Sequence, residues 1–429
     1  MTQLPEEIID AEVIGLGHSG DGVVETDGGK RYVPYAAPGD RIQIKLQAGE
    51  KDRAAIVQIL KPGEARVTPP CPHFGDCGGC ALQHLSDPFV AGWKRLQIMD
   101  ALSSRGLNDI DVRPTLTMPR ASRRRAAFTA EHGANGIQLG FNARMSNRMV
   151  PVTDCCVLDP HIVQALPGLA EMLAPLLRHG QTGRLTVTWT RTGLDVDVQI
   201  GSADRGEPNL RLRSLLATSA DRIDLARLSW NGVALLERRK PEILMGSVTV
   251  CPPPGGFLQA SADGEQALTA LVLEALGKKI LSTKGVRVLD LFAGCGTFTF
   301  PVAPHARVHA VEGDKAMAAA IRQAANQVQG LKQIEVSHRD LQRGPLSIEE
   351  LTPYAAVIFD PPKAGARAQA TQLAASTVRK VIAVSCAPAT FARDARALAD
   401  GGFSLRWVAP VDQFRWSAEV ELVALFERP

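Results

Sequence analysis

Three cysteines in the first fifth of the chain have the spacing of metal ligands. Cys71, Cys77 and Cys80 stand with five and then two residues between them, among glycines that let the chain wrap tightly. Thiolates bind zinc and iron–sulfur clusters, and both kinds of site commonly use four of them. The neighbours Cys155 and Cys156 are the best source of a fourth. The spacing therefore predicts a four-thiolate site, with a cluster and structural zinc both open.

A second chemical signal is the segment 286–301, VRVLDLFAGCGTFTFP, in which an apolar strand runs into a glycine loop. Gly294 and Gly296 let the backbone turn sharply and come close to a ligand. Glu312 follows at the end of the next expected strand, where an acid can hold a ribose diol. The third glycine of a dinucleotide-binding loop is missing. The pattern favours S-adenosylmethionine as cofactor, and a plain turn without a ligand is the alternative.

Two later strand ends carry further reactive groups. Cys386 closes the apolar segment KVIAVS, and Ala387 and Pro388 after it are expected to hold the thiol at the edge of the sheet. One strand earlier, Asp360 opens DPPK, in which two prolines stiffen the turn. A thiolate at such an edge can be a covalent nucleophile, whereas a buried cysteine would only fill space. Lys363 would either orient RNA or face solvent.

The segment 119–125, PRASRRR, has four arginines in seven residues. Such a run is commonly a solvated face. Because it belongs to the same predicted subdomain as the cysteines, a phosphate-binding edge is the alternative. On that alternative we predict that Arg120, Arg123, Arg124 and Arg125 contact RNA phosphates.

The elements expected around these residues form three domains. Residues 1–67 alternate short apolar strands with glycine turns, as in a five-stranded oligonucleotide-binding β-barrel. Residues 68–255 are predicted to be a central α+β subdomain that holds the cysteines. Residues 256–429 alternate strands and helices and end in two strands around 403–408 and 420–426. This is an α/β pattern that predicts a Rossmann-like, seven-stranded class I methyltransferase sheet closed by an antiparallel hairpin.

Composition limits the remaining possibilities. The chain has 429 residues, 45% of them hydrophobic, and a formal net charge of +3. Nucleic-acid binding must therefore rest on local basic clusters. No apolar run approaches the ~18 residues of a membrane span, and the first residues are acidic, so we expect a cytoplasmic protein without membrane contact. We predict no protein partner. In a reducing compartment, clustered cysteines indicate metal binding or catalysis rather than disulfides.

Four segments together resemble the bacterial RNA uracil-5-methyltransferases, the family of the 23S ribosomal RNA and transfer RNA enzymes. They are the first three cysteines with CCVL at 155–158, VLDLFAGCG at 288–296, FDPPKAGA at 359–366 and SCAPATFARD at 385–394. The N-terminal barrel likewise resembles the TRAM domain of RNA-modifying enzymes. The resemblance covers nearly the whole chain. It implies methylation of uracil carbon 5 in RNA, with 23S ribosomal RNA as the first expectation and transfer RNA as the second.

The resemblance also implies roles for individual residues. Matching the family's CPxL motif through Leu158 makes Cys155, rather than Cys156, the fourth ligand of a [4Fe–4S] cluster. The other three ligands are Cys71, Cys77 and Cys80. The family's methyl-donor positions fall on Gln259, Phe292, Thr297, Glu312, Asp340 and Asp360, and threonine at 297 replaces a common asparagine. Cys386 is implied as the nucleophile.

The family's final motif, DxFPHTxHVE, reads DQFRWSAEVE over residues 412–421. It places the catalytic base at Glu421, with Glu419 as a rival two residues earlier. The chemistry needs both groups, because uracil carbon 5 becomes nucleophilic only after a thiolate has added to carbon 6. A target buried in folded RNA must also be flipped out. An RNA cytosine-5-methyltransferase and a non-catalytic RNA-binding protein remain alternatives.

Overall fold

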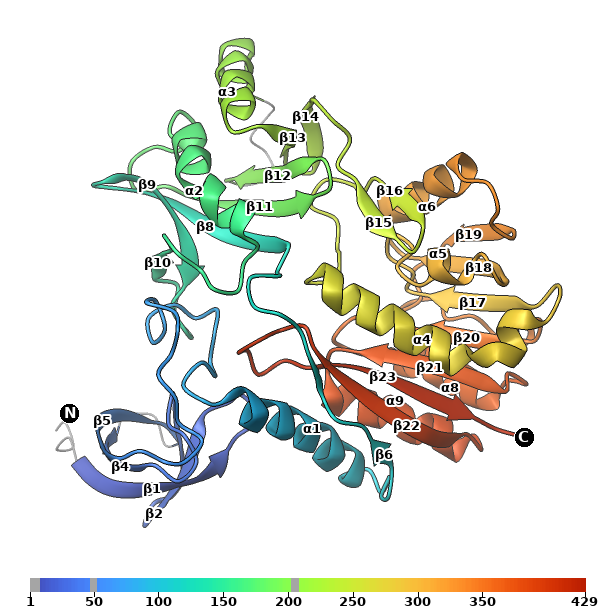
Figure 1. The fold of residues 1–429 in the computed structure, drawn as a ribbon, viewed down its shortest axis with the longest axis horizontal. Coiled ribbons are helices and arrows are strands. Elements are labelled where there is room, and N and C mark those ends of the chain that lie inside the picture. The colour runs from blue at the N-terminus through green and yellow to red at the C-terminus, as the bar shows by residue number, and fades with distance from the viewer. Residues whose placement is uncertain (1–7, 47–51, 202–207) are drawn as a thin grey trace.

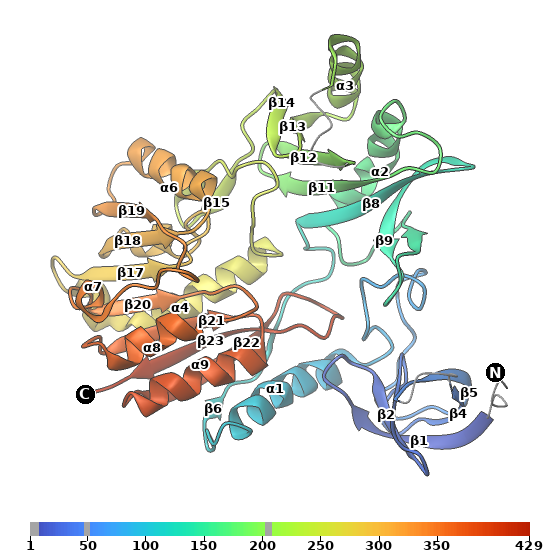
Figure 2. The same cartoon turned by 180° about the vertical axis from the view of Figure 1, so that it is seen from behind.

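The computed structural model describes residues 8–46, 52–201 and 208–429. The chain builds one sheet after another: an N-terminal sheet, a central sheet above it and a large C-terminal sheet beside both (Figure 1). Seen from behind, the long connections between the three sheets run along the middle of the molecule (Figure 2). Within the described part of the chain, no helix is long and apolar enough to cross a membrane.

The N-terminal sheet is antiparallel, with the order β3-β2-β1-β4-β5. Its strands are β1 (Ile8–Leu16), β2 (Gly22–Thr26), β3 (Gly29–Val33), β4 (Arg41–Leu46) and β5 (Ala54–Lys61). The two outer strands meet, because Tyr32 on β3 forms a parallel bridge with Arg53 and its N–H donates to the carbonyl of Asp52 at 2.8 Å. Alternate apolar residues such as Val24 and Ile42 fill the interior. The five antiparallel strands are confirmed, and the oligonucleotide-binding barrel and its assignment as a TRAM domain stay predictions.

The central sheet has the order β10-β9-β8-β11-β12-β13-β14. Its strands are β8 (Arg125–Gly133), β9 (Gly136–Asn142), β10 (Met149–Pro151), β11 (Thr182–Thr190), β12 (Gly193–Ile200), β13 (Leu225–Trp230) and β14 (Val233–Glu237). The helices α2 (Pro160–Leu173) and α3 (Leu210–Arg222) share one apolar core with it. A small hairpin of β15 (Ile243–Met245) and β16 (Val248–Val250) follows and leads to the C-terminal sheet.

The C-terminal sheet has the order β19-β18-β17-β20-β21-β23-β22-β6. Its main strands are β17 (Arg287–Leu291), β18 (Arg307–Glu312), β19 (Ile334–His338), β20 (Ala356–Phe359), β21 (Lys380–Ser385), β22 (Ser404–Asp412) and β23 (Glu421–Glu427). The first five are parallel, and β23 lies antiparallel between β21 and β22. The predicted α/β sheet with a terminal hairpin is confirmed. Two short strands that we did not predict, β6 (Asp111–Val112) and β7 (Leu116–Thr117), extend it beside β22.

Helices cover both faces of this sheet (Figures 1 and 2). On one face lie α4 (Ala262–Ser282), α5 (Thr299–Val302) and α6 (Lys315–Gln327), and on the other lie α1 (Asp87–Ser103), α7 (Ile348–Leu351), α8 (Arg367–Ala375) and α9 (Pro388–Asp400). Helix α1 comes from the predicted central subdomain, yet Ile98 and Leu102 on it are buried in the core of the C-terminal sheet. The domain ranges 1–67, 68–255 and 256–429 stay a prediction, and residues 87–117 pack with the last of them.

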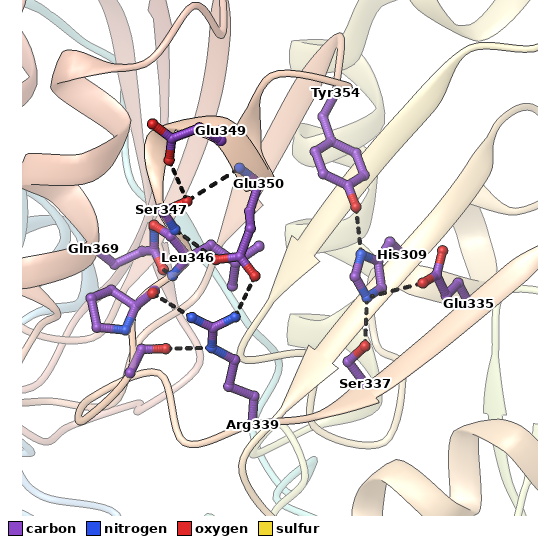
Figure 3. A network of polar contacts seen from close by, with 12 residues as sticks. His309, Glu335, Ser337, Arg339, Leu346, Ser347, Glu349, Glu350, Tyr354 and Gln369 are labelled. Carbon is purple, nitrogen blue, oxygen red and sulfur yellow. Dashed lines mark hydrogen bonds and ion pairs between the residues drawn. The ribbon is translucent and has the colours of Figure 1, made fainter.

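Polar contacts hold the outer strands of the sheet to the helices behind them (Figure 3). His309 on β18 contacts the hydroxyl of Tyr354 at 2.5 Å and the hydroxyl of Ser337 at 2.8 Å. Arg339, directly after β19, donates to Glu350 of α7 at 2.6 Å. Gln369 of α8 exchanges two hydrogen bonds with the backbone of Leu346. These contacts join β18 to β19 and to the segment after α7, and they join α7 and α8 to the loop after β19.

Candidate active site

The carboxyl ends of β17, β18, β20 and β21 meet at one edge of the C-terminal sheet, where ligands bind in open α/β sheets. Leu291 pairs with Phe359, so the next residues, Phe292 and Asp360, lie side by side. Phe359 in turn pairs with Ala383 on β21, the strand that leads to Cys386. Strand register alone therefore brings the predicted cofactor and nucleophile residues to one edge.

Cys386 and Glu421 are neighbours across two antiparallel strands. Ser385 at the end of β21 pairs with Leu422 on β23, so one further step sets Cys386 beside Glu421. Burial and the charge of Glu421 raise the pKa of the half-buried Cys386 thiol to about 12. Glu421 itself is only 4% exposed. Burial raises its pKa to about 7, opposed by a hydrogen bond from Gln413.

The rival carboxylate, Glu419, has a different environment. It lies before the start of β23 rather than on that strand. Its Oε1 accepts a hydrogen bond from Nζ of Lys363 at 2.6 Å, and both side chains are exposed. Lys363 therefore faces solvent as one half of a surface ion pair. Glu421 is buried beside Cys386, whereas Glu419 is exposed and paired with Lys363, so the geometry favours Glu421 as the base.

Acidic groups crowd this edge. Burial and the charges of Glu421, Asp290 and Glu312 raise the pKa of Asp360 well above its usual range. Asp290 at the end of β17 is fully buried, and burial raises its pKa to about 7. Its Oδ2 accepts from the Thr299 hydroxyl at 2.5 Å, whereas its Oδ1 is buried without a partner among the described residues. An unpaired acceptor among carboxylates suits a cationic ligand such as the sulfonium and ammonium groups of S-adenosylmethionine.

The glycine loop after β17 contains backbone conformations that are uncommon in proteins. Phe292 has a φ of 63°, uncommon for a residue with a side chain, and Gly296 has a φ of 97°. A Cβ at Gly296 would lie 2.6 Å from the ring of Phe300, so glycine is required there. The N–H of Gly294 donates to Glu312 at 2.7 Å, which ties the loop to the end of β18. Thr297 is half-buried in the same loop.

The two remaining cofactor candidates lie on opposite sides of this edge. Asp340 is exposed in the loop after β19, next to the backbone of Gly313. Its Oδ1 accepts the N–H of Gln342 at 3.0 Å. Gln259 precedes α4, is 3% exposed, and accepts a hydrogen bond from Gln413 at 2.7 Å. The structure thus brings Gln259, Asp360, Cys386 and Glu421 together and leaves Asp340 at the rim, past Glu312.

The four predicted metal ligands line one cavity of about 280 Å³. Cys71, Cys77, Cys80 and Cys155 all contribute to its wall, and Cys156 does not. Among the described residues, no set of three or more His, Cys, Asp or Glu side chains is arranged to hold a single metal ion. Four thiols around a cavity fit a cluster better than one zinc ion, because each ligand of a four-iron cluster binds a different iron.

The arginine run does not form one phosphate-binding edge. Arg124 is 6% exposed, and its Nη2 lies 2.7 Å from Oε2 of Glu265 on α4. Arg125 donates to the carbonyl of Gly255 at 3.0 Å, and Arg123 lines the cysteine cavity. Only Arg120 is exposed, at 53% of its side chain, near Asp87. The prediction that all four arginines contact phosphates is wrong for Arg124, which instead joins the central sheet to α4.

Comparison with known proteins agrees with this geometry. The family model described as tRNA (Uracil-5-)-methyltransferase matches residues 255–429. An uncharacterized RNA methyltransferase of Brucella suis is 42% identical over 413 residues, 96% of each chain. The 23S rRNA (uracil(1939)-C(5))-methyltransferase RlmD of Chromohalobacter salexigens is 32% identical over 427 residues, 96% of this chain and 88% of its own. The chain belongs to the RNA uracil-5-methyltransferase family.

A solved structure supports the fold over the full length. The crystal structure of the Pyrococcus abyssi tRNA (uracil-54, C5)-methyltransferase in complex with S-adenosyl-L-homocysteine matches with a TM-score of 0.74 and 22% identity, covering 97% of this chain and 99% of the other. The protein is therefore an RNA (uracil-5-)-methyltransferase that uses S-adenosylmethionine and has the class I fold. Membership of this family sets aside the cytosine-5-methyltransferase and the non-catalytic alternatives.

In this RNA uracil-5-methyltransferase, the loop 412–421, in which the family's final motif is altered, is attached to N-terminal elements. The carbonyl of Trp416 accepts the N–H groups of Ala81 and Leu82, directly after the cysteine loop, at 2.8 and 3.0 Å. Arg415 donates to Asp87 at 2.5 Å and to the carbonyl of Met118 at 2.9 Å. The side chain of Arg415 and the backbone of Trp416 thus anchor the loop that leads to Glu421. Sequence patterns gave no sign of these contacts, nor of Asp290 as part of the site beyond its acidity in an apolar strand.

Proposed function

We propose that this enzyme methylates carbon 5 of a uridine in 23S ribosomal RNA through a covalent adduct with Cys386. The observation that carries the proposal is the adjacency of Cys386 and Glu421 at the ends of β21 and β23. A thiol and a buried carboxylate with a pKa of about 7 are the two groups that this reaction requires.

The bond changes follow from uracil chemistry. The Cys386 thiolate adds to carbon 6, and the electron pair of the carbon 5–carbon 6 double bond moves onto the carbonyl as an enolate. Carbon 5 then forms a bond to the methyl group, whose bond to the donor sulfur would break so that the donor leaves as an uncharged thioether. Glu421 removes the proton that carbon 5 still carries, the double bond re-forms, and the thiolate of Cys386 leaves. The bound donor would supply the electrophilic methyl group and a positive charge that favours the thiolate.

We further propose that Gln259, Phe292, Thr297, Glu312, Asp340 and Asp360 hold S-adenosylmethionine. Their placement along the strand ends supports this, as does the unpaired Oδ1 of Asp290. Glu312 follows the loop at the position suited to a ribose diol. Asp360, Asp290 and Glu421 are carboxyl groups whose charged forms a bound sulfonium ion would favour, because a nearby positive charge lowers the pKa that burial raises.

We propose a [4Fe–4S] cluster at Cys71, Cys77, Cys80 and Cys155, and a TRAM-like role in RNA delivery for the N-terminal sheet. The shared cavity supports the ligand set. When bound, the cluster would cross-link the loop 71–80 to residue 155 at the side of the central sheet. That loop continues into Ala81 and Leu82, which hold Trp416, so the cluster site and the catalytic loop are adjacent in space.

The choice of RNA rests on the relative from Chromohalobacter salexigens, which is named for 23S ribosomal RNA and matches nearly the whole chain. Transfer RNA is the second candidate, since the matching solved structure is named for a transfer RNA position. Mass-spectrometric mapping of 5-methyluridine in both RNAs, from cells with and without the gene, decides between them. We expect one 23S uridine to lose its methyl group. A loss confined to transfer RNA would overturn this target.

A further inference from the structure

Gln413 connects two parts of the active site that no strand joins. It follows β22 directly, is 5% exposed, and extends its side-chain amide between α4 and β23. Its Nε2 lies 2.7 Å from Oε1 of Gln259 and 2.9 Å from Oε2 of Glu421. Its Oε1 lies 3.1 Å from the backbone nitrogen of Ala260. One amide therefore touches the proposed base, the proposed donor-binding glutamine and the backbone next to it.

The orientation of this amide is fixed by its surroundings. The N–H of Ala260 can only donate, so the group that faces it must be the oxygen of Gln413. The nitrogen then faces Glu421 and Gln259, and its two hydrogens go one to each. Both donor hydrogens of the amide and one acceptor position of its oxygen are therefore used.

This arrangement also fixes Gln259. Because its Oε1 accepts from Gln413, its own amide nitrogen must point the other way. Among residues 8–46, 52–201 and 208–429, that nitrogen has no hydrogen-bond partner and is not sealed from solvent. Gln259 is thus held with a donor group available to an anionic or carbonyl group of a ligand.

We propose that Gln413 is a positioning residue that aims the base Glu421 and the ligand-binding amide of Gln259 at the same time. This inference rests on the proposed function, because it takes Glu421 as the base and Gln259 as part of the methyl-donor site. Gln413 would therefore act on two steps of the reaction. It orients a group that binds the methyl donor, and it orients the group that later removes the carbon-5 proton.

The link has an electrostatic consequence. Asp360 at the end of β20, Cys386 at the end of β21, and Glu419 with its partner Lys363 are the ionisable groups that face Glu421 from the surrounding elements. Burial and the charge of Glu419 raise the pKa of Glu421, and the hydrogen bond from Gln413 lowers it. Without that bond the pKa rises, and proton removal then needs a higher pH.

The test is Gln413→Met, which keeps the length of the side chain and removes its hydrogen bonds. Release of the covalent enzyme–RNA adduct is followed in single-turnover reactions across pH. We expect release to slow by roughly tenfold to a hundredfold at pH 7, since a hydrogen bond to a charged group is lost, with its midpoint moved up by about one pH unit. Calorimetric binding of S-adenosylhomocysteine should weaken by about fivefold, because Gln259 is freed to flip.

Gln369→Met is the matched control. It removes two buried amide hydrogen bonds of the same kind, far from Glu421 on α8, so it costs stability without moving the pH midpoint. If Gln413→Met has too little folded protein, the isosteric Gln413→Glu replaces it, and its added charge should move the midpoint further upward. A wild-type midpoint and wild-type ligand affinity in either variant would overturn the inference. Failure of the wild-type enzyme to form any adduct would instead refute the proposed function.

Discussion

The ammonium group of Lys94 lies 2.5 Å from the carboxylate of Asp412, although 318 residues separate them in the sequence. Both side chains are shielded from solvent, at 0% and 2% exposure. Lys94 also donates to the carbonyl of Phe414 at 3.2 Å. Helix α1 thereby holds the start of the loop that ends at Glu421. A helix far away in sequence from the catalytic domain is part of what positions its base.

Removing Lys94 should therefore damage both stability and catalysis. Lys94→Met leaves the carboxylate of Asp412 buried and unpaired, which costs about 3–5 kcal/mol. Urea unfolding of the two proteins measures the loss. The double variant Lys94→Met/Asp412→Leu should recover most of the stability but not the activity. As a control, Arg396→Met breaks an exposed ion pair and should cost well under about 1 kcal/mol. Equal losses for Lys94→Met and Arg396→Met would contradict the assignment.

Asp290 should make stability depend on pH. Burial raises its pKa in the folded chain to about 7, far above the ordinary value of an aspartate, so the folded state binds the proton more tightly than the unfolded state does. That contribution is complete below the unfolded value and is lost as pH rises through 7. Asp290→Asn should therefore raise the melting temperature more at pH 8 than at pH 5, while it weakens methylation. The exposed Asp400→Asn should show no such difference, and a pH-independent effect of Asp290→Asn would refute the burial argument.

The sequence predicted those parts of the fold and of the site that local residue patterns determine. Short apolar runs and the glycine loop predicted the parallel strands and the terminal hairpin, and strand ends placed Cys386 and Asp360 at one edge, whereas Glu421 was expected from the resemblance to the family's final motif. The sequence did not predict those features that depend on contacts between residues far apart in the chain. Two-residue strands such as β6 have no periodicity to detect. Arg124 looks like its exposed neighbour Arg120 in sequence, because only the approach of Glu265 from α4 buries it.

The exposed and the buried arginines of the segment 119–125 should respond differently to substitution. Arg120→Ala should reduce the slope of RNA binding against salt by roughly 0.7 to 0.9 log units per log unit, as one lost phosphate contact does, and leave stability unchanged. Arg124→Met should leave the slope unchanged and destabilise the fold by about 3–5 kcal/mol, since Glu265 loses its buried partner. Fluorescence anisotropy over a salt series measures the first effect. An unaltered slope for Arg120→Ala would make the run a solvated face.

Substitutions of the adjacent residues Cys155 and Cys156 should have different effects on the metal content of the protein. Protein purified without oxygen should be brown and contain four iron atoms per chain if the cluster proposal holds. Cys155→Ser should lose iron, because residue 155 lines the shared cavity, while Cys156→Ser should keep it. Iron analysis and absorption spectra read out both variants. Colourless protein with one zinc per chain would show that the site is a four-thiolate zinc site and not a cluster. Iron loss only in Cys156→Ser would make Cys156 the fourth ligand.

The covalent step is tested most directly by denaturing gel electrophoresis of the enzyme after incubation with S-adenosylmethionine and its RNA. Without a base the carbon-5 proton stays, so Cys386 cannot leave. Glu421→Gln should accumulate a protein–RNA complex that survives denaturation, and adding Cys386→Ala should abolish it. Glu419→Gln, which only breaks the surface pair with Lys363, should turn over without trapping the complex. Normal turnover by Glu421→Gln together with a trapped adduct in Glu419→Gln would contradict the account of the base.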